Sequence, residues 1–336
     1  MVRVAINGFG RIGRRVFRLL LSHPKIQIVA INDLADTKTL AHLLKYDSIH
    51  GTLKRTVSSD DKHISIDKKT IPVLNKIHPK DLNRNPYDVD IVIESTGKFK
   101  SKSELIHHIN NGASKVILSV PPIDDDLKTV VLGVNDDLLQ NNDLIISNAS
   151  CTTNNSAPML SIINTLCGIN QAYITTVHSY TTDQSLHDQP HKDLRRARAA
   201  GQSIVPTTTG AAKALTKIFP ELADCIGGCG IRVPVINGSL TDITFNVKKA
   251  TSVEAVNTAF KHASETTFKG VLEYTEDPIV SIDIVGRKES SIVDTELTKV
   301  DGNLVKLVSW YDNESGYSAR LIDLCSRVLS LNKDLV

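Results

Sequence analysis

A glycine-rich turn near the start of this 336-residue chain restricts its fold more than any other feature. The apolar run Val2–Asn7 has the length of a buried strand and leads directly into GFGRIG at residues 8–13. The stretch Ile12–Leu21 then has the apolar periodicity of a helix that buries one face. A strand, a GxGxxG turn and a helix in this order predict a dinucleotide-binding unit.

Each glycine of this turn has a distinct expected task. Gly8 permits the tight turn, Gly10 lets the backbone approach a pyrophosphate, and Gly13 lets the helix pack on the strand. The phosphates are expected at the helix N-terminus, where amide donors lack helical partners. A second strand, Ile26–Ile31, is followed by Asp33, twenty residues after Gly13. A carboxylate at that spacing bonds the adenosine ribose and repels a 2′-phosphate, so NAD is favoured over NADP.

The rest of the first half continues the alternation of strands and helices. Further strands are predicted at 89–94, 114–119, 130–134 and 144–148, with a helix at 101–111. Residues 52–75 are largely polar, with polar and apolar residues in alternation, which predicts an antiparallel excursion at the edge of the sheet. The first half is therefore expected to form a Rossmann-type, doubly wound α/β domain with a mainly parallel sheet.

The second half has a different pattern. Long β-rich runs are predicted as strands at 171–180, 229–235, 239–247 and 304–310, with helices at 210–219 and 252–266. This pattern predicts an α+β domain with a mostly antiparallel sheet. The segment Thr181–Pro206 is polar and lacks periodicity, and a loop this long is usually functional or interfacial. We expect a dinucleotide-binding domain at 1–150, a catalytic domain at 151–313, and a C-terminal helix at 314–336 that packs back on the first domain.

One cysteine and one histidine are candidates for covalent catalysis. Cys151 lies in SNASCTTN, between an apolar strand and a predicted helix at Ser156–Leu166, so the helix dipole favours its thiolate. His178 ends a β-branched strand twenty-seven residues later. Cysteine and histidine together support nucleophilic catalysis by sulfur. The alternatives are a buried structural cysteine and a hydrogen-bonded histidine at a strand end.

Composition excludes several other classes of protein. The net charge is +2, from 39 basic and 37 acidic residues, so no nucleic-acid partner is expected. The five cysteines show no zinc-finger or CxxC spacing, so neither a metal site nor disulfides are expected, and a reducing compartment fits best. The N-terminal apolar run is too short for a signal peptide, and no run approaches transmembrane length. We therefore expect a cytoplasmic protein without membrane contact.

The whole chain, from Val2 to the C-terminal helix, resembles the phosphorylating glyceraldehyde-3-phosphate dehydrogenases. The resemblance rests on several specific motifs. These are NGFGRIGR at 7–14, ESTG at 94–97, SNASCTTN at 147–154, TTVHSYTTDQ at 175–184, LRRARAA at 194–200, TTTGAAKA at 207–214 and WYDNESGYS at 310–318.

The resemblance implies that Cys151 is the nucleophile and that His178 is the base that activates it. Thiolate attack on an aldehyde gives a hemithioacetal, oxidation gives a thioester, and inorganic phosphate cleaves the thioester to an acyl phosphate. Substrate- and phosphate-binding positions are also implied: Ser150, Thr152, Thr181, Asp183, Arg196, Thr209, Gly210 and Arg232.

Two anion sites are distinguished within that set. The substrate phosphate is assigned to Thr181, Asp183 and Arg232. The attacking phosphate is assigned to Ser150, Thr209, Gly210 and Arg196, with Arg195 as the alternative arginine. Arginine and hydroxyl donors are the appropriate chemistry for phosphate, although the arginine run also fits a solvated loop face.

The resemblance further implies a set of contacts to NAD. These contacts involve Gly8, Gly10, Arg11, Ile12, Gly13, Asp33, Thr96, Gly97, Ser119, Asn313 and Tyr317. Arg11 and Ile12 are placed at the pyrophosphate, Asn313 at the carboxamide and Tyr317 near the nicotinamide, where a tyrosine is equally explained as a core residue. A homotetramer is implied, with the loop 181–206 near the cofactor site of a neighbouring subunit.

The chain departs from the family pattern at several positions. Asn155 replaces the second cysteine of CTTNC, Ile77 replaces an arginine near the adenine, and Ser315 replaces a tryptophan. Two other functions remain possible at this level. Erythrose-4-phosphate dehydrogenase shares the fold and the nucleophile but hydrolyses its thioester, and a non-catalytic binding protein could use the same fold.

Overall fold

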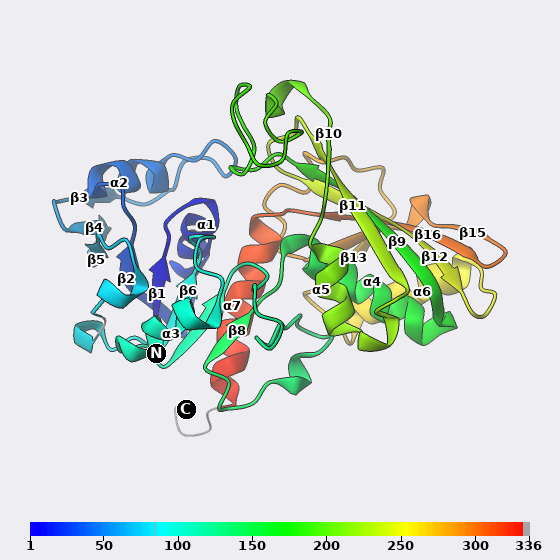
Figure 1. Ribbon diagram of the computed structural model, residues 1–336, viewed down its shortest axis with the longest axis horizontal. Coiled ribbons are helices and arrows are strands. Elements are labelled where there is room, and N and C mark those ends of the chain that lie inside the picture. The colour runs from blue at the N-terminus through cyan, green and yellow to red at the C-terminus, as the bar shows by residue number, and fades with distance from the viewer. Residues whose placement is uncertain (84, 332–336) are drawn as a thin grey trace. The chain divides into compact units, whose positions relative to one another are not determined.

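The computed structural model describes residues 1–83 and 85–331 and divides the chain into two compact units (Figure 1). Unit 1 comprises Met1–Val130, Asp137–Ala149 and the C-terminal segment from Ser318. Unit 2 comprises Val131–Asp136 and Ser150–Tyr317. Among the described helices, none combines the length and the apolar character needed to cross a bilayer.

Unit 1 contains an eight-stranded sheet, within the described residues, in the order β3-β4-β5-β2-β1-β6-β7-β8. The strands are β1 Val2–Asn7, β2 Ile26–Asn32, β3 Val57–Ser59, β4 His63–Ile66, β5 Lys69–Leu74, β6 Ile91–Glu94, β7 Lys115–Leu118 and β8 Ile145–Ser147. From β5 to β8 all pairs are parallel, whereas β3, β4 and β5 pair in antiparallel fashion at one edge. The Rossmann-type order and the antiparallel excursion are therefore confirmed.

The helices of unit 1 follow from local sequence signals. They are α1 Arg11–Leu20, α2 Thr37–Lys45, α3 Lys102–Asn110 and most of α7 Ser315–Ser330, with 3-10 turns at Pro79–Asp81, Asn85–Tyr87 and Asp136–Leu138. Ser101 and Glu104 form a capping box at the start of α3. The predicted C-terminal helix is present as α7, and its expected extension over 332–336 lies outside the described residues.

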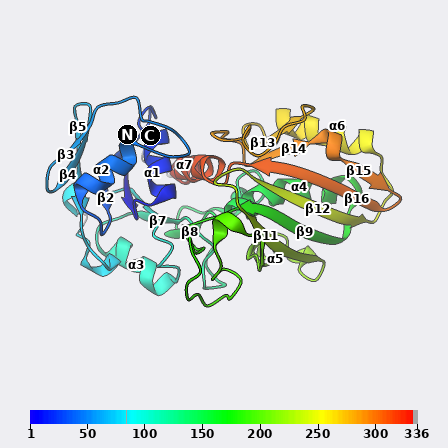
Figure 2. The ribbon, with the colours of Figure 1, turned by 90° about the horizontal axis from the view of Figure 1, so that it is seen from above.

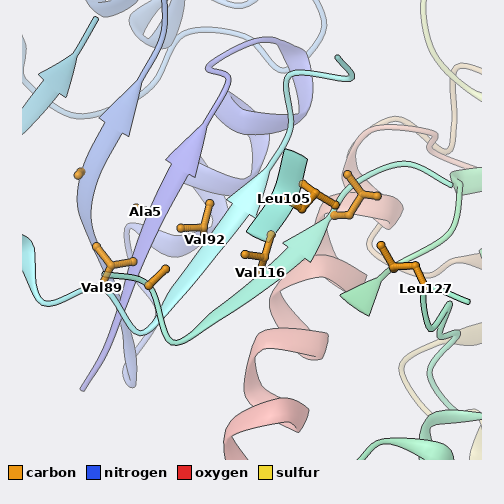
Figure 3. Close-up of a cluster of buried hydrophobic side chains, with 9 residues drawn as sticks. Ala5, Val89, Val92, Leu105, Val116 and Leu127 are labelled. Carbon is orange, nitrogen blue, oxygen red and sulfur yellow. The ribbon is translucent and has the colours of Figure 1, made fainter. Parts of the chain in front are cut away.

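A buried apolar cluster holds α3 against the sheet of unit 1. Figure 3 shows Leu105 of α3 close to Val92 of β6 and Val116 of β7, and all three side chains are fully buried. Burying an aliphatic side chain contributes about 1.5–3 kcal/mol. This packing fixes the carboxyl ends of β6 and β7, which carry Thr96 and Ser119 on the segments that follow.

Unit 2 contains a second eight-stranded sheet, again within the described residues. The strands are β9 Ile169–Ser179, β10 Val205–Thr207, β11 Ile226–Val233, β12 Ser239–Val247, β13 Leu272–Thr275, β14 Ser291–Asp294, β15 Lys299–Asp301 and β16 Leu304–Tyr311. Figure 2 shows β11, β9, β12 and β16 side by side. Most pairs are antiparallel, as predicted, and two pairs, β9 with β11 and β13 with β14, are parallel.

Helices cover one face of this sheet. The helices are α4 Cys151–Cys167, α5 Ala211–Ile218 and α6 Val253–Glu265, with 3-10 turns at Ala200–Gln202, Pro220–Leu222 and Thr295–Leu297. The long helix α4 packs against β9, β12 and β16, and it also contacts α5 and α6. Along β9 and β16 the residues that point away from α4 include Tyr173 and Leu304, which are 54% and 49% exposed.

Two predictions about elements were wrong. No strand forms at 130–134, because Gly133 adopts a left-handed φ of +80° and the Asn135 side chain accepts from the Val131 amide, which turns the chain. Only the isolated bridge between Thr129 and Ser147 remains there. The segment predicted as a loop up to Pro206 ends in a short strand, β10, which pairs with β11.

Candidate active site

The first candidate, Cys151, is the first residue of helix α4. The preceding Ala149 has a left-handed φ of +56°, which turns the chain sharply out of the strand. Ser150 caps the helix, because its Oγ accepts from the Thr153 amide at 3.1 Å. The helix therefore starts five residues earlier than predicted, and the thiol lies in its first turn, close to unpaired amide groups.

His178 lies against the thiol of Cys151. Its Nε2 is 3.4 Å from the Sγ atom, and the imidazole is almost completely buried at the end of β9. Its Nδ1 is 2.7 Å from the carbonyl oxygen of Ser179. Since a carbonyl only accepts, a proton on Nδ1 satisfies this contact and leaves the Nε2 lone pair facing the thiol. The structure thus brings the two predicted residues together in a geometry suited to proton transfer.

A third residue beside this pair is Arg232, which carries a charge. Pairing of β9 with β11 places Arg232 opposite His178, and one guanidinium nitrogen lies 3.1 Å from the Ser179 oxygen and 2.5 Å from Nδ1. Because a guanidinium only donates, it bonds the Ser179 oxygen when the imidazole proton is on Nδ1, and it bonds Nδ1 only in the other tautomer. Burial, with a further contribution from the Arg232 charge, lowers the pKa of His178 to about 3. The imidazole is therefore neutral near pH 7 and is able to accept a proton.

The thiol of Cys151 is less acidic than the sequence predicts. Burial raises its pKa, and this effect outweighs the opposing charge of Arg232 and the hydrogen bonds around Thr152. The helix field that favours the thiolate is therefore outweighed by burial in the direction of the pKa shift. Deprotonation of Cys151 requires a base, which is the task for which His178 is placed.

A tyrosine that the sequence reading missed supports the imidazole. Tyr311 is fully buried, and its ring contacts that of His178 edge-on with centroids 5.9 Å apart. Its hydroxyl lies 2.9 Å from Thr152 Oγ1 and 2.8 Å from Thr176 Oγ1. The predicted anion residue Thr152 is thus part of a buried hydroxyl network. The only sequence signal for Tyr311 is its place in the WYDNESGYS motif.

The predicted anion residues form a charged cluster in unit 2. The Arg196 guanidinium pairs with Asp183, and its Nε donates to Thr207 Oγ1 at 2.9 Å. Besides burial, which lowers the pKa of Arg232, the charge of Arg196 also lowers it, and the charge of Asp183 raises it. In contrast, Arg195 is exposed. Of the two alternatives for the attacking phosphate, Arg196 is the one held in this cluster.

The remaining anion candidates lie next to the ends of a strand and a helix. Thr181 follows β9 by two residues. Thr209 and Gly210 precede α5, and Thr209 Oγ1 accepts from the Ala211 amide at 3.2 Å. A hydroxyl and free amides at a helix start are suited to binding an anion.

In unit 1, the glycine-rich turn has the expected close contacts. A Cβ on Gly8 would lie 2.6 Å from the Thr96 amide nitrogen, and a Cβ on Gly13 would lie 2.1 Å from the Gly8 oxygen. A Cβ on Gly10 would meet no atom within 4 Å, so this glycine borders open space. The three roles predicted for the glycines agree with these distances, and the open side at Gly10 fits a pyrophosphate.

The other predicted cofactor residues of unit 1 surround this turn. One Asp33 oxygen accepts from the Phe9 amide at 2.7 Å, which links the carboxylate to the turn. The Arg11 guanidinium forms a bidentate pair with the buried Asp47, at 2.8 and 3.1 Å. Its side chain is thus engaged away from a phosphate, and Arg11 and Ile12 offer the backbone amides of the first turn of α1. Asp47 was missed by the sequence reading.

Further cofactor candidates follow the neighbouring strands of the sheet. Thr96 follows β6, and Gly97 has a left-handed φ of +68°. Ser119 follows β7 and is largely buried. In parallel sheets, ligands bind beyond these carboxyl ends.

In unit 2, Asn313 has a defined amide orientation. Its Oδ1 accepts from Ser179 Oγ at 2.9 Å and from Ser239 Oγ at 3.0 Å. Its Nδ2 is therefore left to donate elsewhere, as a carboxamide contact requires. Tyr317 is buried, as expected for a core residue. Its burial gives no support to the predicted contact with the cofactor.

The three unusual residues have different surroundings. Asn155 is completely buried, and its amide donates to Ser309 Oγ at 2.9 Å and to the Ser290 carbonyl at 3.2 Å. Ser315 is buried, and its amide donates to Asp312 at the start of α7. Ile77 is 65% exposed. The Asn155 side chain is thus held through its amide nitrogen, whereas its buried Oδ1 has no hydrogen-bond partner among the described residues, and the bond at Ser315 comes from the backbone.

The fold and the thiol–imidazole pair define a class of dinucleotide-dependent dehydrogenases that oxidise aldehydes through a cysteine. Family comparison is specific: the NAD binding domain of glyceraldehyde 3-phosphate dehydrogenase matches residues 2–102, and the C-terminal domain matches residues 150–313. The chain belongs to the glyceraldehyde-3-phosphate dehydrogenase family. The dinucleotide is therefore NAD, as the position of Asp33 predicts.

Curated relatives cover nearly the whole chain. A glyceraldehyde-3-phosphate dehydrogenase of Geobacillus stearothermophilus is 50% identical over 98% of this chain and 98% of its own length. Glyceraldehyde-3-phosphate dehydrogenase 1 of Bacillus cereus is 49% identical over 98% of this chain and 99% of its own length. Glyceraldehyde-3-phosphate dehydrogenase 2 of Streptomyces avermitilis is 52% identical over 96% of this chain and 97% of its own length.

Proposed function

We propose that this protein oxidises D-glyceraldehyde 3-phosphate with NAD and inorganic phosphate to give 1,3-bisphosphoglycerate, a step of glycolysis and gluconeogenesis. The observation that carries the proposal is the 3.4 Å contact between Cys151 and a neutral, buried His178 in a chain of this family. The alternative, erythrose-4-phosphate dehydrogenase, is not favoured, because the full-length relatives are named for glyceraldehyde 3-phosphate.

The chemistry begins with proton transfer from Cys151 to His178. The Nε2 lone pair accepts the thiol proton as Sγ attacks the aldehyde carbon, and the imidazolium returns this proton to the former carbonyl oxygen, which gives a hemithioacetal. His178 then takes the hydroxyl proton of the hemithioacetal as this intermediate is oxidised to a thioester. Bound NAD supplies the acceptor for the hydride. Burial and the charge of Arg232, whose guanidinium lies 2.5 Å from Nδ1, lower the pKa of His178. The imidazolium therefore releases each proton readily and returns to its neutral form.

A thioester retains enough reactivity for phosphate to displace the thiolate. We assign the substrate phosphate to Thr181, Asp183 and Arg232, among which Asp183 acts by holding Arg196. The attacking phosphate is assigned to Ser150, Arg196, Thr209 and Gly210, and Thr152 is kept as an anion-binding candidate without assignment to one of the two sites. Guanidinium, hydroxyl and helix-start amide donors support both assignments.

We assign NAD to residues 1–150, together with the C-terminal helix 314–336, and catalysis to residues 151–313. The residues that would hold NAD are Gly8, Gly10, Arg11, Ile12, Gly13, Asp33, Thr96, Gly97, Ser119, Asn313 and Tyr317. Open space beside Gly10 supports a pyrophosphate at the glycine-rich turn, and the donor side of the Asn313 amide supports its contact with the carboxamide.

We also propose that the protein is a cytoplasmic homotetramer. The sheet face of unit 2 that α4 leaves uncovered exposes Tyr173 and Leu304, and exposed apolar groups on a sheet face favour association with another copy. All five cysteines are free, which supports a reducing compartment. Light scattering at micromolar concentration should give a tetramer, and a monomer would refute the assembly.

The activity is tested by following NADH formation with glyceraldehyde 3-phosphate. With phosphate present, turnover should continue; without it, NADH should stop after about one equivalent per site. Erythrose 4-phosphate serves as the comparison substrate, and Cys151→Ser is the inactive control. Faster turnover with erythrose 4-phosphate, or turnover that needs no phosphate, would contradict the proposal.

A further inference from the structure

A buried polar network joins the carboxyl ends of three neighbouring strands in unit 1. Asn7 ends β1, Asn32 ends β2 and Glu94 ends β6, and strand pairing places Asn7 beside both of the others. Glu94 has no exposed surface. Burying a carboxylate costs free energy unless hydrogen-bond donors surround it. The donors around Glu94 therefore indicate what this residue does in the structure.

Four donor groups surround the Glu94 carboxylate. Asn7 Nδ2 donates to Oε2, and Nε2 of the fully buried His108 on α3 lies 2.9 Å from the same oxygen. The other oxygen, Oε1, accepts from the Thr96 amide at 2.9 Å and also from the Thr96 hydroxyl. Both oxygens are therefore fully engaged, and two of the donors belong to Thr96 itself.

Through these bonds the network reaches three of the segments proposed to hold NAD in unit 1. Thr96 packs against Gly8 so closely that a Cβ on Gly8 would lie 2.6 Å from its nitrogen, and Ser95 Oγ donates to the Gly8 oxygen at 2.7 Å. Asn32 Nδ2 donates to Asn7 Oδ1 at 2.7 Å. Asn32 also immediately precedes Asp33. The segments at Gly8, Asp33 and Thr96 are thus tied to one carboxylate.

We propose that Glu94 is a positioning residue for NAD. It holds the Thr96 segment against the glycine-rich turn, so that the ribose and pyrophosphate contacts are in place before the cofactor arrives. His108 supports it from α3 by donating to Oε2. This inference rests on the proposed NAD contacts of Gly8, Asp33 and Thr96, and it adds two residues that touch neither the cofactor nor the substrate.

The substitution Glu94→Gln tests the role with little change in shape. Glutamine replaces one carboxylate oxygen by an NH2 group, so at least one of the four donors then faces another donor. Asn7 cannot turn its amide to compensate without losing its bond from Asn32. We expect the dissociation constant for NAD, measured by titration calorimetry, to rise by about tenfold or more, since hydrogen bonds to charged groups are the stronger ones. The KM for NAD should rise similarly, while kcat at saturating NAD should stay within about twofold.

The matched control is Glu104→Gln on helix α3 of the same unit. Glu104 closes the capping box with Ser101, and a glutamine oxygen can still accept from the Ser101 amide, so this variant should change the unfolding midpoint little and leave the affinity for NAD unchanged. An affinity for NAD that is unchanged in Glu94→Gln, as in this control, would overturn the proposal.

A second pair of variants covers the case in which Glu94→Gln does not fold. His108→Leu removes the donor from α3, whereas glutamine at position 108 retains a donor at a similar reach. NAD should bind about threefold or more weakly to His108→Leu than to His108→Gln. Equal affinities would overturn the proposal. If the unmodified protein did not bind NAD at all, the proposed function would fail instead, so the two failures are distinguishable.

Discussion

The neutral state of His178 makes a measurable contribution to stability that depends on pH. An unfolded histidine binds a proton below its ordinary pKa of 6.5, but the buried imidazole of His178 has a pKa of about 3. Between these values the unfolded chain binds more protons than the native protein, so acid favours unfolding. The stabilisation is complete above about pH 6.5 and is lost progressively as pH falls toward 3.

The magnitude follows from the size of the pKa shift. The shift from 6.5 to about 3 corresponds to about 5 kcal/mol in the limit of low pH, at about 1.4 kcal/mol per unit. At pH 5, roughly 1.5 units below the ordinary pKa, the loss is about 2 kcal/mol. Since the side chain is only 5% exposed, little of this effect is screened by water.

The assay compares the unmodified protein with His178→Asn. The free energy of unfolding in urea is measured at pH 7.5 and pH 5, at one protein concentration, because association would change apparent stability. The unmodified protein should lose about 2 kcal/mol more than the variant between the two pH values. Equal losses would show that His178 is not held neutral, and the argument that it serves as the base would then lose its foundation.

Three further predictions concern the other residues of the site. Alkylation of Cys151 by iodoacetamide should still accelerate with pH beyond the ordinary range of a thiol, because burial raises its pKa, and a plateau near neutral pH would contradict this. Asp33→Ala should lower the ratio of catalytic efficiency with NAD to that with NADP, and an unchanged ratio would mean that Asp33 does not face the ribose. Thr209→Ala and Arg196→Ala should preserve the first-turnover burst of NADH but slow the phosphate-dependent steady state. Each variant should lose about 1.5–3 kcal/mol of interaction with the attacking phosphate. Loss of the burst with normal phosphate dependence would mean that the two anion sites are exchanged.

Elements with strong local signals were predictable from the sequence. The strand β1, the glycine-rich turn and helix α1 lie within the first twenty residues and depend only on neighbouring positions. The strand β12 was predicted with its observed bounds, 239–247, because apolar and polar residues alternate along it. The strand expected at 130–134 failed for an equally local reason: its β-branched run contains Gly133, whose left-handed backbone turns the chain.

The parts of the site that depend on distant residues were not predictable. Arg232 meets His178 only because β11 pairs with β9 in one register, and no pattern near either residue encodes that register. Tyr311 meets Thr152 across 159 positions of the sequence. Likewise, the raised pKa of Cys151 arises from burial by surrounding elements, whereas the sequence displays only its favourable place at a helix start.

The most direct test of the account is to trap the acylated enzyme. The protein is mixed with NAD and glyceraldehyde 3-phosphate without inorganic phosphate, quenched in acid, digested and analysed by mass spectrometry. We expect a 3-phosphoglyceryl thioester on the peptide that contains Cys151, and this thioester should disappear when phosphate is added before quenching. An adduct on any other cysteine, or NADH formation with no adduct on Cys151, would contradict the account.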